Sequence, residues 1–475
     1  MNYMLEELTD ILDDIIPDED SDLEESILYT EDFLEMVLHL MEEYVTEDPM
    51  AIAEPDFHNV FLDEIGEMVM SQVGHELWRY SDETITERIE EICEVFYASF
   101  MPRRSHPTTF ILHDKINVKQ LTKQIDYLRS KPQPTQRTAA WYEFRHKLIT
   151  ASNAYKGFTD GCELNQIIFE KCQPLRVPDT SEKTTPTFVN VDTTLHWGQK
   201  FEPLSVMIYE DKYKTTIEDF GCIQHDKYYF LGASPDGINV DKKSLRYGRM
   251  LEIKNIVNRE IDGIPKLEYW IQMQLQMETC NLDECDFIET RFVEYENETA
   301  FNEDDSSCTE YKGLIMYFTQ DGHPIYKYAP LHLSTTELVE WEAEQHQQTK
   351  DVWIKNIYWK TDQVSCVLVQ RNQRWFQDNI LTLQEVWKTI EYERVHGFQH
   401  RAPSRRVLSN KTNNHPENEG QNGCLISLDK ETGQVSVLPS SSHPAPTIMA
   451  IDLKIRTESF DDTKEKMSSI IELNT

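Results

Sequence analysis

The sequence lacks the features that place a protein in a membrane or outside the cell. No apolar run approaches the roughly 20 residues that are needed to cross a bilayer. The first ten residues, MNYMLEELTD, contain neither the basic residues nor the apolar stretch of a secretory signal. We therefore expect a protein that acts inside the cell and has no membrane partner.

Cysteine is sparse, with 9 residues scattered over a chain of 475. The closest pair, Cys280 and Cys285, has no matching second pair that would suggest a zinc site or an iron–sulfur cluster. We expect reduced and mostly buried thiols.

Basic residues are missing from the first 78 positions, which carry 24 acidic residues and so account for −24 of the net charge of −38. Apolar residues recur with a helical period at residues 32–45 and 84–100, which predicts a helical bundle over about 23–100. We assign residues 1–100 to an acidic helical accessory domain. Its role is that of a solvated domain, a docking site for a basic partner or a mimic of DNA.

The sign of the charge then reverses. Residues 101–137 contain eight basic residues and only two acidic ones. Lys119 and Lys123, four positions apart, share one face of a predicted helix. We interpret residues 101–135 as a basic linker that either contacts a phosphate backbone or is simply solvated.

Two short segments carry the strongest chemical signal. In residues 231–239, LGASPDGIN, the rigid Pro235 and the permissive Gly237 predict a tight turn that aims Asp236. In residues 251–255, LEIKN, strand alternation places Glu252 and Lys254 on one face. Residues 240–250 between the segments are interpreted as an extended hairpin tip.

Two carboxylates that lie close together raise each other's pKa unless a cation joins them, and carboxylate oxygens suit Mg²⁺ or Mn²⁺. Such an ion activates a bound water, and a lysine can orient that water toward a phosphate. Each motif alone also fits an ordinary β-turn or a surface ion pair. The pattern nevertheless favours a metal-dependent phosphodiesterase.

Three further segments occur in a recognisable order. QRTAAWYEFRHKLITASNA (136–154) and LHWGQKFEPL (195–204) precede the two motifs, and YWIQMQLQMET (269–279) follows them. The whole series resembles the YqaJ-type viral recombinase family, the lambda-exonuclease branch of the PD-(D/E)XK nucleases, over about residues 136–295. The resemblance implies an α/β fold with a restriction-endonuclease-like mixed sheet flanked by helices.

The resemblance also implies roles for single residues. Asp236 and Glu252 would hold the metal, with the Ile253 carbonyl as a further ligand. Lys254 would serve the attacking water, and Glu202 would support the site from the preceding helix.

A 5′-phosphate pocket is implied by the same family. Its residues would be Arg145, Ser152 and Gln274, and Ser152 stands where a helix N-cap is expected. On a helix, however, Gln272 and Gln276 share a face that Gln274 does not. Gln272 therefore remains a second candidate.

After the motifs, alternation predicts a strand at 287–295 and a hairpin at 314–328, and helices are predicted at 338–351 and 381–393. Trp353, Trp359 and Trp375 are interpreted as core residues rather than base-stacking platforms. We assign residues 136–397 to the nuclease domain with a helical extension and 398–475 to a mostly disordered tail.

The function predicted from the resemblance is Mg²⁺-dependent exonucleolytic digestion of linear double-stranded DNA, 5′ to 3′, in recombination, repair or viral genome processing. The resemblance suggests a large DNA virus as the source, with host cytoplasm or nucleus as the compartment. It also suggests a single-strand annealing protein or further copies of the chain as partners. Two alternatives stay open: an RNA-degrading nuclease, and an interaction protein with a vestigial nuclease core.

Overall fold

The computed structural model describes residues 26–111, 115–136, 138–175, 190–304, 310–320 and 322–403, together with two short strands beyond them. The chain divides into two compact units, Met1–Ser404 and Arg405–Thr475. In the second unit, β11 (Ile426–Leu428) pairs antiparallel with β12 (Val435–Val437). The predicted disorder of the tail otherwise lies outside the described residues from 404 onward.

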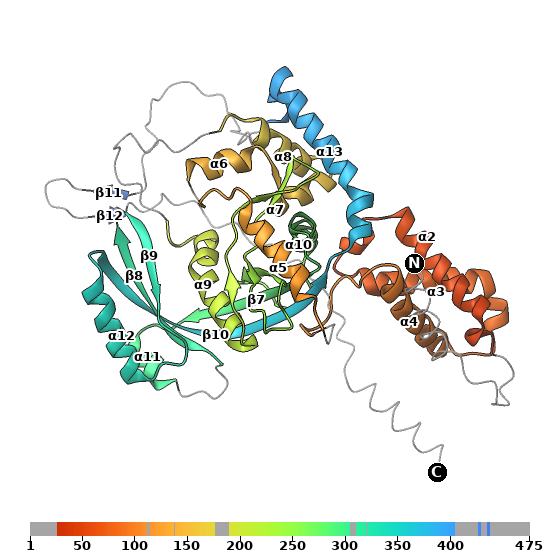
Figure 1. Cartoon of the computed structure of the whole chain (residues 1–475), viewed down its shortest axis with the longest axis horizontal. Helices are drawn as coiled ribbons and strands as arrows, with labels where there is room; N and C mark the ends of the chain where they lie inside the picture. Colours follow the sequence, from red (N-terminus) through yellow and green to blue (C-terminus); the bar gives the residue numbers. More distant parts are fainter. Residues whose placement is uncertain are drawn as a thin grey trace, which may run out of the picture. The chain divides into compact units, whose positions relative to one another are not determined.

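The first unit begins with the predicted helical bundle, drawn in red and brown in Figure 1. It consists of the short turns η1 (Ile27–Tyr29) and η2 (Ala51–Ala53) and of α2 (Glu31–Glu47), α3 (Phe57–Leu77) and α4 (Asp82–Ser99). The side chains of Thr30 and Ser81 cap α2 and α4. Phe61 lies at the centre, where its ring contacts those of Tyr44, Phe57 and Phe96.

A mixed sheet of seven strands forms the centre of the first unit, in the order β2-β5-β6-β7-β10-β8-β9. Among the described strands of this sheet the only parallel pair is β6 with β7, and α10 lies between these two strands in the chain. Parallel strands require such a crossover connection. The sheet strands are β2 (Ile217–Glu218), β5 (Gly237–Asn239), β6 (Met250–Asn255), β7 (Glu284–Glu294), β8 (Lys312–Gln320), β9 (His323–Tyr328) and β10 (Val352–Gln370).

A second sheet of three short strands has the order β1-β4-β3, with β1 (Ile149–Thr150), β4 (Leu231–Ala233) and β3 (Ile223–Gln224). Helices flank both sheets (Figure 1), so the predicted mixed α/β architecture is confirmed. These helices and turns are α5 (Val118–Ser130), α6 (Ala139–His146), α7 (Ala151–Ala154), η3 (Tyr155–Phe158), α8 (Cys162–Cys172), α9 (Thr194–Tyr213), α10 (Leu267–Cys280), α11 (Glu298–Glu303), α12 (Thr335–Gln348), α13 (Gln373–His396) and η4 (Gln399–Arg401).

The elements predicted after the motifs are confirmed, with ends that shift by a few residues except for the last helix, which begins eight residues earlier than predicted. The strand at 287–295 is β7, the hairpin at 314–328 is β8 with β9, and the two helices are α12 and α13. Trp359 and Trp375 are buried as predicted, whereas Trp353 is 46% exposed, so its assignment to the core is wrong. Among the described residues no helix has the length and apolar character of a membrane span.

The helical bundle contacts the rest of the first unit. Arg104 donates hydrogen bonds to the carbonyl oxygens of Ala53 and Pro265, at 2.9 and 2.6 Å. Arg374 of α13 donates to Thr46 of α2 at 2.8 Å. The predicted boundary at residue 100 therefore coincides with a packed interface.

Two expectations for the turn and loop around Asp236 need correction. Residues 240–249 connect antiparallel β5 and β6, but Arg246, Tyr247 and Arg249 are buried, so this segment is no extended tip. Gly237 starts β5 without a positive φ. Glycine is needed there for close packing, because a Cβ atom would lie 2.2 Å from Cγ2 of Ile217.

This packing leads to a test of stability. We expect Gly237→Ala to lower the free energy of unfolding by about 1–3 kcal/mol, because the added methyl group overpacks the contact between β5 and β2. Gly198→Ala is the matched control, since nothing lies within 4 Å of a Cβ built there. Chemical denaturation measures both variants, and equal midpoints would contradict the packing role of Gly237.

Candidate active site

Asp236 and Glu252 converge where the turn after β4 meets β6. Asp236 lies in the turn just before β5, and its Oδ2 accepts a hydrogen bond of 2.7 Å from the backbone N–H of Ile253. Its own N–H donates to the carbonyl of Leu251 at 3.2 Å. Since these bonds anchor Asp236 to the strand that carries Glu252, the two carboxylates share one place.

Strand alternation places the charged and the apolar side chains of β6 on opposite faces, as predicted. Leu251 and Ile253 pack with Tyr209 and Ile288 on one face of β6. Glu252 lies on the other face, fully buried, with Lys254 Nζ 2.5 Å from its Oε1. A buried carboxylate and a lysine therefore form a close ion pair inside the site.

The negative charges of Asp236 and Glu252 repel each other in this buried site. Burial raises the pKa of Asp236 well above its usual value, and the negative charge of Glu252 raises it further. Burial opposes the charge of Lys254, but the Glu252 and Asp236 carboxylates outweigh that effect and raise its pKa. Further positive charge at this point would stabilise both carboxylates.

Glutamines of α10 hold Glu252 in place. Gln272 Nε2 donates to Glu252 Oε1 at 2.8 Å, and Gln276 Nε2 donates to Oε2 at 2.8 Å. Gln274 is turned away: its amide bonds the Gln370 carbonyl at 2.9 Å and the Asn372 N–H at 2.7 Å. The structure therefore brings Gln272, and not Gln274, to the site, in agreement with the helical spacing.

The donor set fits a hard divalent cation. Mg²⁺ is typically bound by one or two carboxylates and completes its shell with water and substrate oxygens. Asp236 and Glu252 provide such a pair, and no cluster of three or more His, Cys, Asp or Glu ligands occurs among the described residues. The Ile253 carbonyl stays a predicted ligand, since Ile253 follows Glu252 in β6 and donates its N–H to Asp236.

Glu202 approaches the site from α9. Its side chain is exposed, and its negative charge contributes to the raised pKa of Asp236. Pro203 stands within this helix. Glu202 thus lies within electrostatic reach of the pair formed by Asp236 and Glu252.

Arg145 and Ser234 form a second polar group beside the carboxylates. Arg145 Nη1 lies 3.5 Å from Ser234 Oγ, and its guanidinium stacks 4.6 Å from the ring of Trp141. The Ser234 carbonyl accepts from Gln276 at 3.1 Å, so this group borders Glu252. Sequence reasoning missed Ser234, although it stands two residues before Asp236 in the quoted motif.

Ser152 is placed differently from the expectation. Thr150 occupies the N-cap of α7, a helix of four residues, and Ser152 lies exposed within it. The predicted capping role of Ser152 is therefore wrong. Its Oγ lies 3.5 Å from Oγ1 of Thr150.

Lys171 is a second residue that sequence reasoning did not find. Its ammonium donates to the Arg145 carbonyl at 2.8 Å. Burial, followed by the charges of Arg145 and Arg394, lowers the pKa of Lys171 to about 8. Lys171 lies between the motif segments 136–154 and 195–204, and no local pattern marks it as a neighbour of Arg145.

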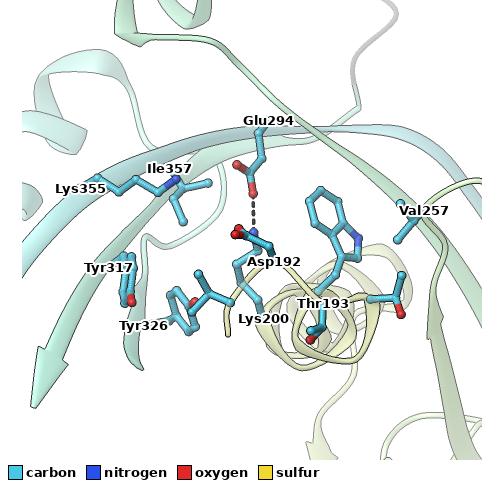
Figure 2. Close-up of a pocket in the computed structure, with 12 residues that line it drawn as sticks. Asp192, Thr193, Lys200, Val257, Glu294, Tyr317, Tyr326, Lys355 and Ile357 are labelled. Atoms are coloured by element: carbon cyan, nitrogen blue, oxygen red, sulfur yellow. Dashed lines mark hydrogen bonds and ion pairs between the residues drawn. The ribbon is translucent and has the colours of Figure 1, made fainter. Parts of the chain in front are cut away.

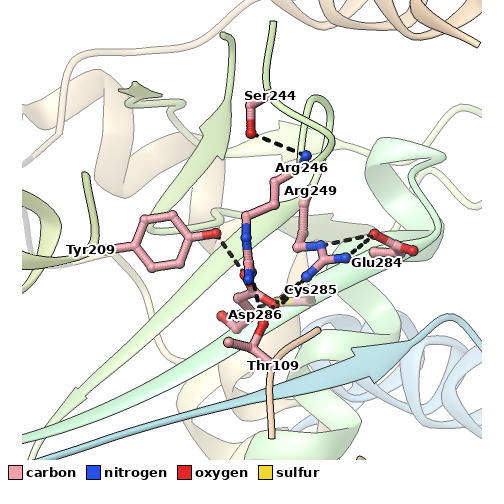
Figure 3. Close-up of polar contacts among 8 residues, drawn as sticks. All are labelled: Thr109, Tyr209, Ser244, Arg246, Arg249, Glu284, Cys285 and Asp286. Atoms are coloured by element: carbon pink, nitrogen blue, oxygen red, sulfur yellow. Dashed lines mark hydrogen bonds and ion pairs between the residues drawn. The ribbon is translucent and has the colours of Figure 1, made fainter. Parts of the chain in front are cut away.

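A buried ionic network lies in the strand next to Glu252 (Figure 3). Asp286 of β7, which pairs with Leu251 of β6, accepts hydrogen bonds from Arg246, Arg249 and Tyr209. Thr109 also donates to it, at 2.6 Å. The network ties the 240–249 connection and α9 to the strand beside the site.

Comparisons with known proteins agree with the motifs. A model of the YqaJ-like viral recombinase domain matches residues 140–283. The resemblance is confirmed over this segment. The YqaJ-like segment contains Asp236, Glu252 and Lys254 as well as Arg145.

Two further comparisons match longer parts of the chain at low sequence identity. An uncharacterized protein of Acanthamoeba polyphaga mimivirus is 24% identical over 368 residues, which cover 68% of this chain and 65% of that protein. Two crystal structures of LHK-Exo, an alkaline exonuclease from Laribacter hongkongensis, are each 18% identical with a TM-score of 0.31. They cover 54% of this chain and 97% and 95% of their own, and one contains dAMP.

The Asp286 network predicts a large effect on stability. Asp286→Asn should lower the free energy of unfolding by about 3–5 kcal/mol, because it leaves Arg246 and Arg249 buried without the shared anion. Asp283→Asn is the control, since the side chain of Asp283 is 77% exposed, and it should change stability by less than about 0.5 kcal/mol. Urea denaturation compares the two, and similar midpoints would show that the network contributes little.

Proposed function

We propose that this chain is a metal-dependent exonuclease that hydrolyses linear double-stranded DNA from the 5′ end. The observation that carries the proposal is the convergence of Asp236, Glu252 and Lys254. Arg145 and Lys171, which we call the basic group, lie beside them. The match to the YqaJ-like viral recombinase domain supports the same chemistry.

Each residue has a distinct role in the proposed reaction. Asp236 and Glu252 would hold Mg²⁺ or Mn²⁺, which when bound supplies Lewis acidity toward a phosphate and a more acidic water. Lys254, held at 2.5 Å from Glu252, orients the water that attacks phosphorus. Gln272 and Gln276 fix the Glu252 carboxylate, so that its oxygens need no rearrangement before the reaction.

The basic group supports recognition of a 5′-phosphate. Arg145 presents a planar guanidinium suited to phosphate oxygens, and the Ser234 hydroxyl lies beside it. Lys171 adds a second cation at the Arg145 carbonyl. Ser152 is proposed to contact the same phosphate from α7. A terminal phosphate held here would place the adjacent phosphodiester near Glu252, which gives the proposed polarity.

The regions outside the site have supporting roles in this proposal. Residues 101–135, with exposed Lys119 and Lys123 on α5, are proposed to contact the DNA backbone. The acidic domain of residues 1–100 and the tail of residues 398–475 are proposed as accessory regions. Recombination, repair and viral genome processing are the processes proposed for the activity, with a single-strand annealing protein or further copies of the chain as partners.

Removing either carboxylate tests the chemistry. Asp236→Asn and Glu252→Gln should each lower the rate of duplex digestion by more than about 100-fold, because each removes a charge that holds the metal, and Lys254→Ala should lose most activity. Glu260→Gln, an exposed residue outside the site, is the control and should digest normally.

The assay uses 5′-phosphorylated linear duplex with Mg²⁺ or Mn²⁺, and an RNA duplex of the same sequence reports the sugar preference. Melting curves with and without the ion provide a second readout, because binding to the folded state raises Tm. Wild-type digestion rates in either carboxylate variant would remove these residues from the mechanism.

Arg145 tests the proposed polarity. Arg145→Ala should reduce the preference for phosphorylated over hydroxyl 5′ ends by about 10- to 100-fold, since a charge-assisted contact contributes about 1.5–3 kcal/mol. Lys147→Ala is the matched control, because Lys147 is exposed and pairs with Glu143. An unchanged preference in a stably folded Arg145→Ala protein would argue against the phosphate pocket and against 5′ to 3′ digestion.

A further inference from the structure

A cavity of about 250 Å³ lies beside the first turns of α9 (Figure 2). Trp197 and Lys200 line it from this helix, Tyr317 and Tyr326 from β8 and β9, and Lys355 from β10. None of these residues belongs to the catalytic group or to the proposed phosphate pocket. The cavity therefore has no role in the reaction described so far.

The walls offer aromatic faces of fixed orientation. The rings of Tyr317 and Tyr326 lie 5.1 Å apart at an angle of 34°, and the hydroxyl of Tyr326 lies 2.6 Å from His196 Nε2. Trp197 packs against Phe201 at 4.5 Å, and its Nε1 is buried without a hydrogen-bond partner among the described residues. The walls therefore present aromatic rings against which a flat ring can pack.

The charges of the cavity indicate a ligand with few phosphates. Lys200 forms an ion pair with Glu294, marked in Figure 2, so these two charges cancel. Lys355 is exposed at the rim, and Thr193 and Thr194 at the N-terminal end of α9 also line the space. Asp192 at the same end opposes a dense cluster of negative charge. One phosphodiester fits this balance better than a triphosphate.

The cavity adjoins the catalytic group through two elements. Lys200 precedes Glu202 by two residues on α9, and Val257 of the cavity follows Lys254 by three residues. Asn255 Nδ2 donates to the Gly198 carbonyl at 2.9 Å, which joins the end of β6 to α9. The cavity and the catalytic group therefore share α9 and the end of β6.

Size limits the ligand further. Pockets for drug-sized molecules occupy roughly 300–1,000 Å³, so a cavity of about 250 Å³ suits a single nucleoside better than a base pair. We propose that this cavity binds one unpaired deoxynucleotide, with its base against the Trp197 and Tyr326 rings and its phosphate toward Lys355. This proposal rests on the proposed nuclease function, and either a frayed strand or a released mononucleotide supplies the same ligand chemistry.

Binding of a fluorescein-labelled DNA tetranucleotide to the full chain tests the proposal. The Asp236→Asn background prevents digestion, and fluorescence anisotropy reports the dissociation constant. Trp197→Ala should weaken binding by about 5- to 100-fold, the range that loss of one stacked base produces. Trp353→Ala is the matched control, because Trp353 is partly exposed on β10 and does not line the cavity. Equal affinities of the two variants would overturn the proposal.

Two further variants protect the test from a folding defect. If melting curves show that Trp197→Ala is unfolded, tetranucleotide binding is measured with Trp197→Phe and Lys355→Ala instead. Lys350→Ala is the control for the loss of a positive charge. Lys355→Ala should weaken tetranucleotide binding at least threefold relative to Lys350→Ala, and unchanged affinity in both Trp197→Phe and Lys355→Ala would overturn the site. If dAMP competes with the tetranucleotide and this competition requires Trp197, the released nucleotide is an occupant of the cavity. If dAMP does not compete, the occupant is the frayed strand.

Failure of this proposal can be distinguished from failure of the nuclease function. Tetranucleotide binding is measured without cleavage, whereas the nuclease proposal is tested by digestion of duplex with intact Asp236. A protein that digests duplex normally but binds the tetranucleotide independently of Trp197 retains its proposed function and loses only this cavity.

Discussion

The buried carboxylate of Glu252 is the constraint on which the site depends. A charge with no exposed surface is costly unless donors and an opposite charge surround it, and here Lys254, Gln272 and Gln276 supply them. Those donors come from β6 itself and from α10, the helix of the parallel crossover to β7. The crossover helix between the parallel strands β6 and β7 therefore also positions the glutamines next to the carboxylate that they stabilise.

The same constraint explains why Asp236, which lies in the turn before β5, is hydrogen-bonded to β6. Its carboxylate accepts the Ile253 N–H, and its own N–H donates to Leu251. Two acids are thus held together against their repulsion, and the raised pKa of Asp236 expresses the cost. The cation of the proposed reaction would relieve this repulsion and so would stabilise the folded state.

The sequence predicts the parts of this arrangement that depend on local periodicity. Strand alternation gives the shared face of Glu252 and Lys254, and helical spacing separates Gln272 from Gln274. The mixed α/β class is implied by the resemblance of the motif series to the PD-(D/E)XK nucleases, not by periodicity. Ser234 and Lys171 could not be found in this way, because their proximity to Arg145 arises only when β4, α6 and α8 pack together. The buried role of Arg246 and Arg249 was missed for the same reason: their partner Asp286 is more than 35 residues away.

Net charge and local charge act at different ranges in this molecule. The acidic excess of the first 78 residues would repel DNA over a distance that salt screens to roughly 10 Å at 0.1 M. Within that distance the determining charges are those of single side chains: Arg145 and Lys171 in the candidate site and Lys355 at the rim of the α9 cavity. A chain of net charge −38 can therefore present cations where a strand would pass, because affinity for a phosphate depends on the nearest few charges rather than on their total.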